Sequence, residues 1–435
     1  GPERSRYLFR DGRGPDGDEP PNNWMSTFGG PGWTRITEPD GSPGQWYLHL
    51  FDVSQPDLDW TNSEVRDELE SVLRFWLDRG VDGFRIDVAH GLIKTDGLPD
   101  ADIPLGYLTN PTALAPMWDQ PAVHDVYRRW RQITDEYASD RVLCAEAWVK
   151  PADALARYVR GDELHQSFNF EFLMTPWLAD DLRHIITETL GAAEAVGAPQ
   201  TWVLSNHDVV RHATRLGFDQ SHGPSRPPGI GADDPQPDAT LGLRRARAAT
   251  TVMLGLPGSA YLYQGEELGL PEATRLPDDV RQDPTWERSN HTQRGRDGCR
   301  VPMPWEGSTP SLGFGPGAET WLPQPPEYGA LAVDRQRAAE GSTLELYRQL
   351  LSLRRELRLG CGSLTWYDAG SDDDVLAFTT SAADGRRVLV LANLEASPVR
   401  LPDGARVLVA SSPDVSPELD VPIDTAVWAE IDQPG

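Results

Sequence analysis

Lysine and cysteine are scarce in this chain of 435 residues. Only Lys94 and Lys150 are lysines, so nearly all basic residues are arginines, which indicates a compositional bias of the source. The three cysteines, Cys144, Cys299 and Cys361, are odd in number and widely spaced. They provide neither a disulfide framework nor a zinc cluster, which is typical of a reducing compartment. No apolar run approaches the length of a membrane span.

Positive charge is also in deficit, since 40 Lys and Arg face 67 Asp and Glu and leave a net charge of −27. Such a surface repels nucleic acid phosphates and anionic lipids, so we expect neither a nucleic acid nor a membrane as partner. A neutral substrate is not penalised. The opening residues lack the basic start and apolar stretch of a signal peptide, and we expect a cytoplasmic protein, with any export signal outside this sequence.

The first part of the chain, residues 1–44, is polar and rich in Gly and Pro, which predicts an irregular loop-and-strand excursion without a core of its own. Residues 61–64 then form a capping-box pattern, and Gly80 ends the helix that it begins. Apolar residues recur through this helix at helical spacing, at Val65, Leu69, Val72 and Trp76.

Further helices and strands alternate along the chain. Helical patterns cover Val123–Tyr137 and Leu344–Leu357. Short apolar runs predict five strands, at Val81–Asp87, Val142–Glu146, Ser167–Leu173, Thr201–Ser205 and Ser259–Tyr263. From about residue 362 the pattern changes to alternating strands and turns, as at Val375–Phe378 and Arg387–Leu391, which predicts an all-β module.

Three of these runs end in a carboxylate: Asp87, Glu146 and Asp208. Carboxylates brought to one rim suit sugar-acetal chemistry, in which one attacks the anomeric carbon and another protonates the leaving oxygen. Arg85 lies two residues before Asp87, on the same face of the strand. A fixed cation at that place favours the ionised form of Asp87, as a nucleophile requires.

Repeated strand–helix units with chemistry at the strand ends favour a (β/α) barrel. A doubly wound open sheet is the alternative, but no Gly-rich phosphate loop follows any strand. Five strands are fewer than eight, and a five-stranded remnant would expose two apolar edges. We therefore expect the chain to begin inside the barrel, with three strand–helix units supplied by an N-terminal segment of the same gene product or by a second chain. Without that segment we expect the chain to be inactive.

The sequence resembles the α-amylase family of glycoside hydrolases (family 13), in its α-glucosidase branch. The matching stretches occur in order over essentially the whole chain, at residues 55–60, 80–88, 144–148, 204–208, 263–267 and 296–305. The resemblance implies an α/β fold, a (β/α)8 TIM barrel whose strands 4–8 lie in this chain. It also implies an inserted domain B, whose last part is residues 1–60, a barrel portion at 61–358, and a C-terminal antiparallel β-sandwich at 359–435.

The same resemblance assigns roles to the strand-end residues. Asp87 is the nucleophile, Glu146 the acid/base, and Asp208, beside His207, holds the sugar hydroxyls. The simpler interpretations are a helix-capping Asp87, a structural ion pair of Glu146 and a core His207. Apolar residues before Glu146, with Trp148 two residues on, favour its protonated form.

Other positions are assigned to sugar binding or to structure. Arg300, or Arg296, would bind the far hydroxyl of the terminal glucose and so enforce exo action. Asn169 and Phe170 (with Phe168) would shape the leaving-group side, whereas Glu267 is assigned to structure. Residues 221–238 predict either a mobile rim loop or a plain linker.

The implied activity is that of a retaining, exo-acting α-glucosidase that acts on short α-glucosides such as maltose. Isomaltose and sucrose are alternative substrates, so the type of glycosidic linkage that is cleaved stays open. Val88, directly after the nucleophile, hints at α-1,6 linkages. The alternatives are a transglucosylase or sucrose isomerase with the same site, a catalytically silent accessory subunit, and a metal-dependent barrel hydrolase. The last is disfavoured because no His, Asp or Glu set has ligand spacing, so we expect no metal in the site and no cofactor for the chemistry. A structural calcium would be held by a loop outside this chain.

Overall fold

The computed structural model describes residues 2–101, 115–221, 229–368, 374–381, 385–394, 397–415 and 420–431. The chain divides into two compact units. Unit 1 comprises residues 1–168, 189–198 and 287–292, and unit 2 comprises residues 169–188, 199–286 and 293–435. Within the described ranges, no helix is both long enough and apolar enough to cross a lipid bilayer.

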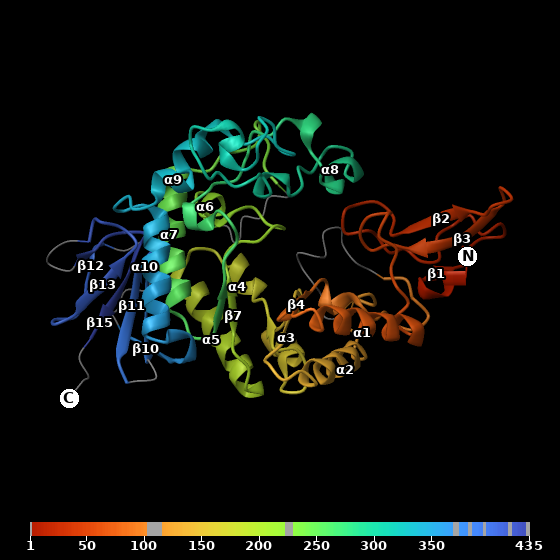
Figure 1. The fold of residues 1–435 in the computed structure, drawn as a ribbon, viewed down its shortest axis with the longest axis horizontal. Coiled ribbons are helices and arrows are strands. Elements are labelled where there is room, and N and C mark those ends of the chain that lie inside the picture. The colour runs from red at the N-terminus through yellow and green to blue at the C-terminus, as the bar shows by residue number, and fades with distance from the viewer. Residues whose placement is uncertain are drawn as a thin grey trace. The chain divides into compact units, whose positions relative to one another are not determined.

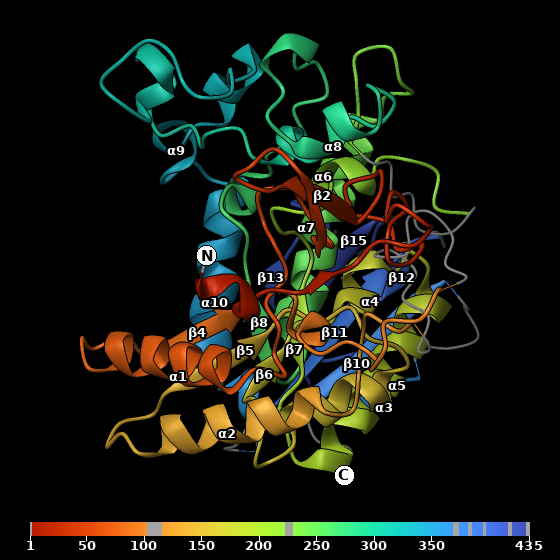
Figure 2. The same ribbon diagram turned by 90° about the vertical axis from the view of Figure 1, so that its right-hand side faces the viewer.

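A three-stranded parallel sheet lies at the centre of unit 1, in the order β4 (Gly83–Ile86), β5 (Val142–Ala145) and β6 (Gln166–Ser167). Helix α1 (Ser63–Leu77) precedes β4 and helix α2 (Val123–Asp135) precedes β5. The two helices lie side by side (Figure 2). The predicted strands and helices in this part of the chain are therefore confirmed, with strand ends one or two residues shorter.

The close pairing of β4 and β5 depends on glycine at the start of β4. A Cβ atom on Gly83 would lie 2.0 Å from the carbonyl oxygen of Val142, a contact that no side chain tolerates. The chain enters β4 from α1, which begins after Asn62, where the side-chain oxygen accepts a hydrogen bond from the Glu64 amide at 2.9 Å. The helix start is therefore confirmed, but its cap is Asn62 and not Thr61, the first residue of the capping-box pattern.

The buried face of α1 includes only part of the apolar residues that recur at helical spacing. Val65, Leu73 and Leu77 are buried, whereas Val72 and Trp76 are 40% and 47% exposed. Residues three and four positions apart both lie on a similar face of a helix. The spacing of the apolar residues alone therefore does not determine which of them are buried.

The predicted strand Ser167–Leu173 is wrong beyond its first residue. Strand β6 ends at Ser167, and α4 (Phe170–Met174) follows as a short helix. Asn169 caps this helix, because its side-chain oxygen accepts a hydrogen bond from the Phe172 amide at 2.9 Å. A short apolar run has no period that separates a buried strand from a buried helical turn.

The opening segment forms an antiparallel sheet of β1 (Phe9–Arg10), β3 (Pro43–Leu48) and β2 (Trp33–Thr37), in that order. Its buried residues share one apolar cluster with residues far along the chain: Leu8, Trp24, Trp33, Leu48 and Leu50 pack with Leu98, Ala115, Met117 and Trp118. The prediction that this segment has no core of its own is confirmed.

Unit 2 contains a pair of parallel strands, β7 (Thr201–Val203) and β8 (Ser259–Tyr261), connected through α7 (Ala239–Gly255). Helix α10 (Thr343–Glu356) packs against α7 (Figure 1). The remaining helices in the described ranges are short, apart from α5: α3 (Ala152–Ala156), α5 (Ala179–Val196), α6 (His212–Arg215), α8 (Pro284–Arg288) and α9 (Val333–Gln336).

The end of unit 2 is the predicted all-β module. Its five-stranded antiparallel sheet has the order β13 (Arg406–Ala410), β15 (Thr425–Glu430), β11 (Arg387–Asn393), β10 (Val375–Ser381) and β9 (Ser363–Trp366). Strands β12 (Val399–Arg400) and β14 (Asp420–Val421) form a second, two-stranded sheet that contributes Leu401 and Val421 to the module's apolar core.

Helix α7 covers β11 and β15 of the larger sheet (Figure 1). The approach is close, since a Cβ atom on Gly255 would lie 2.5 Å from a methyl carbon of Val390. The Trp428 indole donates a hydrogen bond to the Thr251 carbonyl at 2.8 Å. Both faces of the sheet are therefore covered, which explains why β10 and β11 are apolar nearly throughout instead of alternating.

The five predicted parallel strands thus exist as β4 to β8, but they form two sets, one in each unit. No closed barrel is formed by the residues that the structure describes. The proposal that these are strands 4–8 of a larger barrel, and the predicted boundaries at 60 and 358, stay predictions.

A buried acid links α10 to the loop after β8. Glu266 accepts hydrogen bonds from the Tyr263 amide at 3.0 Å and from the Tyr347 hydroxyl at 3.3 Å. Burial raises the pKa of Glu266 to about 8, because two neutral donors do not replace the hydration of a charged carboxylate. The carboxyl group is therefore mostly neutral at pH 7.

This pKa predicts a dependence of stability on pH. Because the pKa rises from 4.5 unfolded to about 8 folded, the contribution of Glu266 is fully present below pH 4.5 and is lost as the pH rises through 8. We expect Glu266→Gln to change the free energy of unfolding little at pH 5 and to stabilise the protein by a few kcal/mol at pH 9, at about 1.4 kcal/mol per pKa unit. Urea unfolding at both pH values measures this. The exposed control Glu327→Gln should show no such trend, and equal effects of Glu266→Gln at pH 5 and 9 would contradict the prediction.

Candidate active site

Two strand-end carboxylates of unit 1 share one arginine. Arg85 on β4 places Nη1 2.6 Å from Oδ1 of Asp87 and Nη2 3.5 Å from Oε2 of Glu146. Strands β4 and β5 are parallel neighbours, with Ile86 opposite Ala145, so the next residues of both strands leave the sheet at the same edge. The structure therefore brings the predicted nucleophile, the predicted acid/base and Arg85 together.

The turn after Asp87 fixes this pair further. Val88 adopts a left-handed backbone conformation, with φ of 45°, which is unusual for a β-branched residue and has to be held by its surroundings. Its amide donates a hydrogen bond to Oε2 of Glu146 at 2.7 Å, and the Ala89 amide donates to the Glu146 carbonyl at 2.8 Å. The turn thereby couples the end of β4 to the end of β5.

Asp87 and Glu146 differ strongly in their surroundings. The Asp87 side chain is 74% exposed, whereas that of Glu146 is 9% exposed. Oε1 of Glu146 accepts a hydrogen bond from the Trp148 indole at 3.0 Å. The Val88 amide and the Trp148 indole therefore give each oxygen of Glu146 a donor, and sequence reasoning found neither hydrogen bond.

Asp208, the third predicted acid, lies in unit 2 at the end of β7. The loop that carries it is an Asx turn, in which Oδ1 of Asn206 accepts a hydrogen bond from the Asp208 amide at 2.8 Å. His207 Nε2 lies 3.2 Å from Oδ2 of Asp208. Both side chains are partly exposed, so the structure leaves them accessible to a ligand of this unit.

Both candidate arginines contact the same atom of Asp208. Nη1 of Arg296 lies 2.9 Å and Nη2 of Arg300 lies 3.1 Å from Oδ1 of Asp208. Arg300 also donates to the His207 carbonyl at 2.8 Å. The structure thus brings four predicted site residues of unit 2 together, and it gives Arg296 and Arg300 similar access to this carboxylate.

Asp283 is a member of this cluster that sequence reasoning missed. Its buried carboxylate accepts hydrogen bonds from Nε of Arg296 at 2.6 Å and from the Arg296 amide at 2.7 Å. Burial acts to raise the pKa of Asp283, but the hydrogen bond and charge of Arg296 outweigh it and lower the pKa to about 2. Nothing in the sequence separates Asp283 from the exposed acids around it.

The structure places the leaving-group candidates in the core of unit 2. Asn169 is fully buried and caps α4, and Phe170, the first residue of α4, is 5% exposed. The assignment of these residues to the leaving-group side stays a prediction. Glu267 accepts a hydrogen bond from the Gly265 amide at 2.8 Å, in keeping with its structural assignment. Of the loop at 221–238, residues 222–228 lie outside the described residues.

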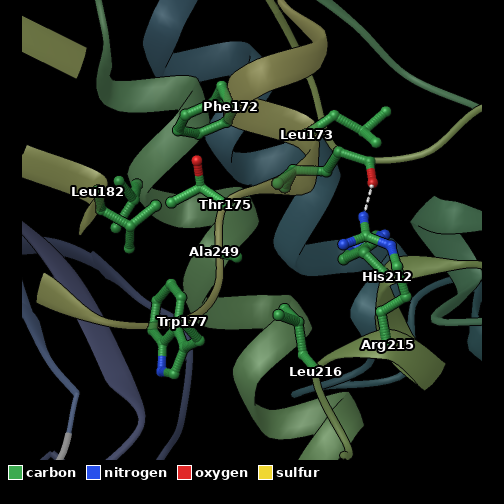
Figure 3. Close-up of a pocket in the computed structure, with 11 residues that line it drawn as sticks. Phe172, Leu173, Thr175, Trp177, Leu182, His212, Arg215, Leu216 and Ala249 are labelled. Carbon is green, nitrogen blue, oxygen red and sulfur yellow. Dashed lines mark hydrogen bonds between the residues drawn. The ribbon is translucent and has the colours of Figure 1, made fainter. Parts of the chain in front are cut away.

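A small hollow in the core of unit 2 is not part of this site (Figure 3). Apolar residues of α4 and α7, with Trp177, Leu182, Leu204 and Leu216, line most of it. The Arg215 guanidinium points to the Leu204 carbonyl at 2.6 Å, and His212 is bonded to Ser205 at 2.8 Å. Burial lowers the pKa of His212 to about 3, so this histidine is neutral and is a buried structural residue. None of the predicted site residues lines the hollow.

Metal-ligating groups do not gather elsewhere in the chain as far as it is described. In those residues, no group of three or more His, Cys, Asp or Glu side chains has the geometry to hold a metal ion.

In each unit, strand-end carboxylates lie beside arginines on parallel strand–helix units, and paired carboxylates are the groups that glycoside hydrolases use. Residues 2–360 match the catalytic domain of the alpha-amylase family. The chain belongs to this family.

Relatives of known activity agree with this assignment. Maltase A2 of Drosophila melanogaster is 31% identical over 355 residues, which are 77% of this chain and 55% of the relative. Oligo-1,6-glucosidase of Parageobacillus thermoglucosidasius is 30% identical over 438 residues, 92% of this chain and 72% of the relative. The chain thus spans little more than half the length of the first of these relatives.

Solved structures extend the likeness to the fold. The alpha-glucosyl transfer enzyme XgtA has a TM-score of 0.81 and 32% identity, covering 99% of this chain and 78% of that chain. The trehalulose synthase MutB of Pseudomonas mesoacidophila has a TM-score of 0.80 and 27% identity, covering 99% and 79%. Together with the family match, these structures imply a (β/α)8 barrel with a C-terminal β-sandwich as the fold to which the chain belongs.

The buried ion pair of Asp283 and Arg296 gives a testable prediction. Because the pKa of Asp283 falls from 3.8 to about 2 on folding, its stabilising contribution is present above pH 3.8 and is lost as the pH falls toward 2. We expect Asp283→Asn to lower the free energy of unfolding by about 2–3 kcal/mol at pH 7, with the difference shrinking below pH 4. Denaturant unfolding at pH 7 and pH 3 measures it. The exposed neighbour Asp279 provides the control Asp279→Asn, and equal losses in the two variants would refute the assignment.

Proposed function

We propose that this chain is the catalytic part of a retaining, exo-acting α-glucosidase. It releases α-glucose from the non-reducing end of short α-glucosides, maltose in the first place, through a covalent glucosyl–enzyme intermediate. The observation that carries the proposal is the contact of Arg85 with both Asp87 and Glu146. Retaining enzymes need two carboxyl groups about 5–5.5 Å apart, and a guanidinium in contact with both groups supports such proximity.

The exposure of the two acids supports their separate roles. In the first step, the exposed carboxylate of Asp87 forms a bond to the anomeric carbon as the glycosidic C–O bond breaks and Glu146 donates its proton to the leaving oxygen. In the second step, Glu146 takes a proton from water, the water oxygen attacks the anomeric carbon, and the bond to Asp87 breaks. Arg85, which donates a hydrogen bond to Oδ1 of Asp87 at 2.6 Å, holds the nucleophile in position between turnovers.

We assign sugar binding to the cluster around Asp208. Its carboxylate accepts hydrogen bonds from two arginines and lies beside His207, so hydroxyl groups find donors and an acceptor in one place. Arg296 is held by Asp283 and therefore keeps its position, whereas Arg300 is anchored only through His207 and Asp208 among the described contacts. Of the two, Arg300 is the better candidate for the far hydroxyl of the terminal glucose.

Glucosyl transfer is the second candidate activity. The covalent intermediate reacts with whichever hydroxyl reaches it, and the solved relatives include an alpha-glucosyl transfer enzyme and a trehalulose synthase. The preference for α-1,4 or α-1,6 bonds depends on the acceptor side of the site. Val88 hints at α-1,6 bonds. Product analysis on maltose, isomaltose and sucrose separates hydrolysis, transfer and isomerisation. The catalytic steps use side chains alone, and we propose no cofactor for them.

We also propose that a further strand–helix segment adds to unit 1. β4 is an edge strand of its sheet, and Val72, Phe75 and Trp76 expose apolar surface on the preceding helix, α1. A parallel strand beside β4, with its helix on α1, would cover both.

Replacement of the nucleophile tests the proposed function. In the protein that carries this chain, Asp87→Asn should lower kcat for glucose release from maltose by roughly 10⁴-fold or more, because asparagine cannot form the glycosyl ester. Circular dichroism should show an unchanged fold, since the exposed Asp87 side chain contributes little packing.

The matched control is Asp82→Asn. Asp82 lies just before β4, and its side chain is 94% exposed and paired with Arg141. This variant should keep normal kcat. Substantial turnover by Asp87→Asn, or an equal loss in both variants, would overturn the assignment of the nucleophile.

A further inference from the structure

A surface groove in unit 2 lies outside the candidate active site. It is formed by the loop at residues 309–326 together with Val280, and has a volume of about 440 Å³. Sites for small molecules span roughly 300–1,000 Å³, so the groove is large enough for more than a single water or ion. No residue of the proposed catalytic or sugar-binding clusters lines it.

The wall of the groove presents an exposed tryptophan on an anchored backbone. The Trp321 side chain is 55% exposed, the highest fraction among the large apolar residues of the described chain. Its neighbour Leu322 is fully buried in an apolar cluster, and the Thr320 hydroxyl donates a hydrogen bond to the Leu322 carbonyl at 2.5 Å. Trp321 is therefore held at the surface instead of folding into the core, and its flat face is available to a ligand.

A second part of the groove lining is fixed as well. Ser311 and Leu312 both have a φ of 46°, and the turn is held by hydrogen bonds from the Trp305 and Glu306 amides to the Leu312 carbonyl, at 2.7 and 3.0 Å. The Ser311 hydroxyl lies within hydrogen-bond distance of the Gly315 and Gly317 carbonyls, at 3.0 and 2.7 Å. A groove with a fixed lining binds a ligand with little loss of conformational entropy.

The chemistry of the lining favours a neutral, hydroxyl-rich ligand. Thr309, Thr320 and Gln324 supply uncharged polar groups near Trp321, and Glu319 is the only charged residue that lines the groove. In a chain with a net charge of −27, such a lining disfavours phosphates and other anions. The combination of an aromatic face with hydroxyl and amide groups matches a sugar ring, which has an apolar face and a polar edge.

The groove is also connected to the arginine segment of the site. Nε2 of Gln324 donates a hydrogen bond to the Pro302 carbonyl at 3.1 Å, two residues beyond Arg300. We propose that this groove is an accessory binding site for a linear α-glucan chain, with Trp321 as its stacking platform. The inference rests on the proposed function for the identity of the sugar.

The test measures binding of maltoheptaose, by isothermal titration calorimetry, to the full chain carrying Asp87→Asn, which prevents turnover. Adding Trp321→Ala should weaken binding at the groove by roughly fivefold or more, the size expected for the loss of one aromatic contact. Trp321→Phe, which keeps a ring, should retain most of the affinity. Ala318→Glu, at an exposed lining position, should weaken binding without risk to the fold, because it adds bulk and a second charge.

The control is Trp76→Ala in unit 1, where the tryptophan is 47% exposed and lies outside the groove. Unchanged maltoheptaose binding in both Trp321→Ala and Ala318→Glu, or an equal loss in Trp76→Ala, overturns the proposal. In the protein that carries this chain, with Asp87 intact, Trp321→Ala should leave kcat and KM for p-nitrophenyl α-glucoside unchanged, since that substrate occupies one glucosyl site. If that protein binds maltoheptaose through Trp321 yet hydrolyses no α-glucoside, the proposed function fails and the groove assignment stands.

Discussion

The parallel pairing of β4 with β5 is the constraint on which the candidate site depends. Parallel neighbours end at the same edge of a sheet, so the residues that follow Ile86 and Ala145 meet without any special loop. Glycine at position 83 permits the close start of this pairing, and the left-handed turn at Val88 completes it by donating to Glu146. Backbone geometry therefore determines that Asp87 and Glu146 lie near one another, and Arg85 then makes their proximity electrostatically acceptable.

Charge compensation follows the same logic in both units. Arg85 serves two carboxylates in unit 1, and Arg296 serves Asp208 and Asp283 in unit 2. Acidic residues greatly outnumber basic residues in this chain. An arginine that is held in place therefore neutralises more than one carboxylate. A planar guanidinium with several donors can bridge two carboxylates at once, which an ammonium group cannot do with the same geometry. The scarcity of lysine in the sequence is consistent with this use of arginine, although composition alone does not require it.

Sequence patterns predicted the strands from apolar runs and the C-terminal module from alternation. They predicted the pair of Asp87 with Arg85 from its i, i+2 spacing. Each of these features depends on residues that are close together in the sequence. The failures have equally physical causes. The apolar run at residues 167–173 has no period that excludes a helix. The helix forms because Asn169 caps its start, a contact that only the structure reveals. The role of the buried Asp283 depends on Arg296, 13 residues away. The donors to Glu146, the Val88 amide and the Trp148 indole, depend on how the chain folds, so none of these contacts leaves a signal in the sequence.

Burial separates the acids that belong to the site from those that belong to the core. Glu266 and Glu272 are buried, and burial raises their pKa values to about 8 and about 7. Perturbed acids of this kind are common at active sites, so a search by pKa alone would select them first. Each, however, accepts hydrogen bonds from groups in the core. Glu266 accepts them from Tyr263 and Tyr347, and Glu272 accepts one from the amide of the buried Arg211. Asp87 has the opposite character, an exposed carboxylate with a fixed cation behind it. An attacking group must reach a ligand that arrives from solvent, so accessibility combined with a positioned counter-charge is the better criterion for the nucleophile.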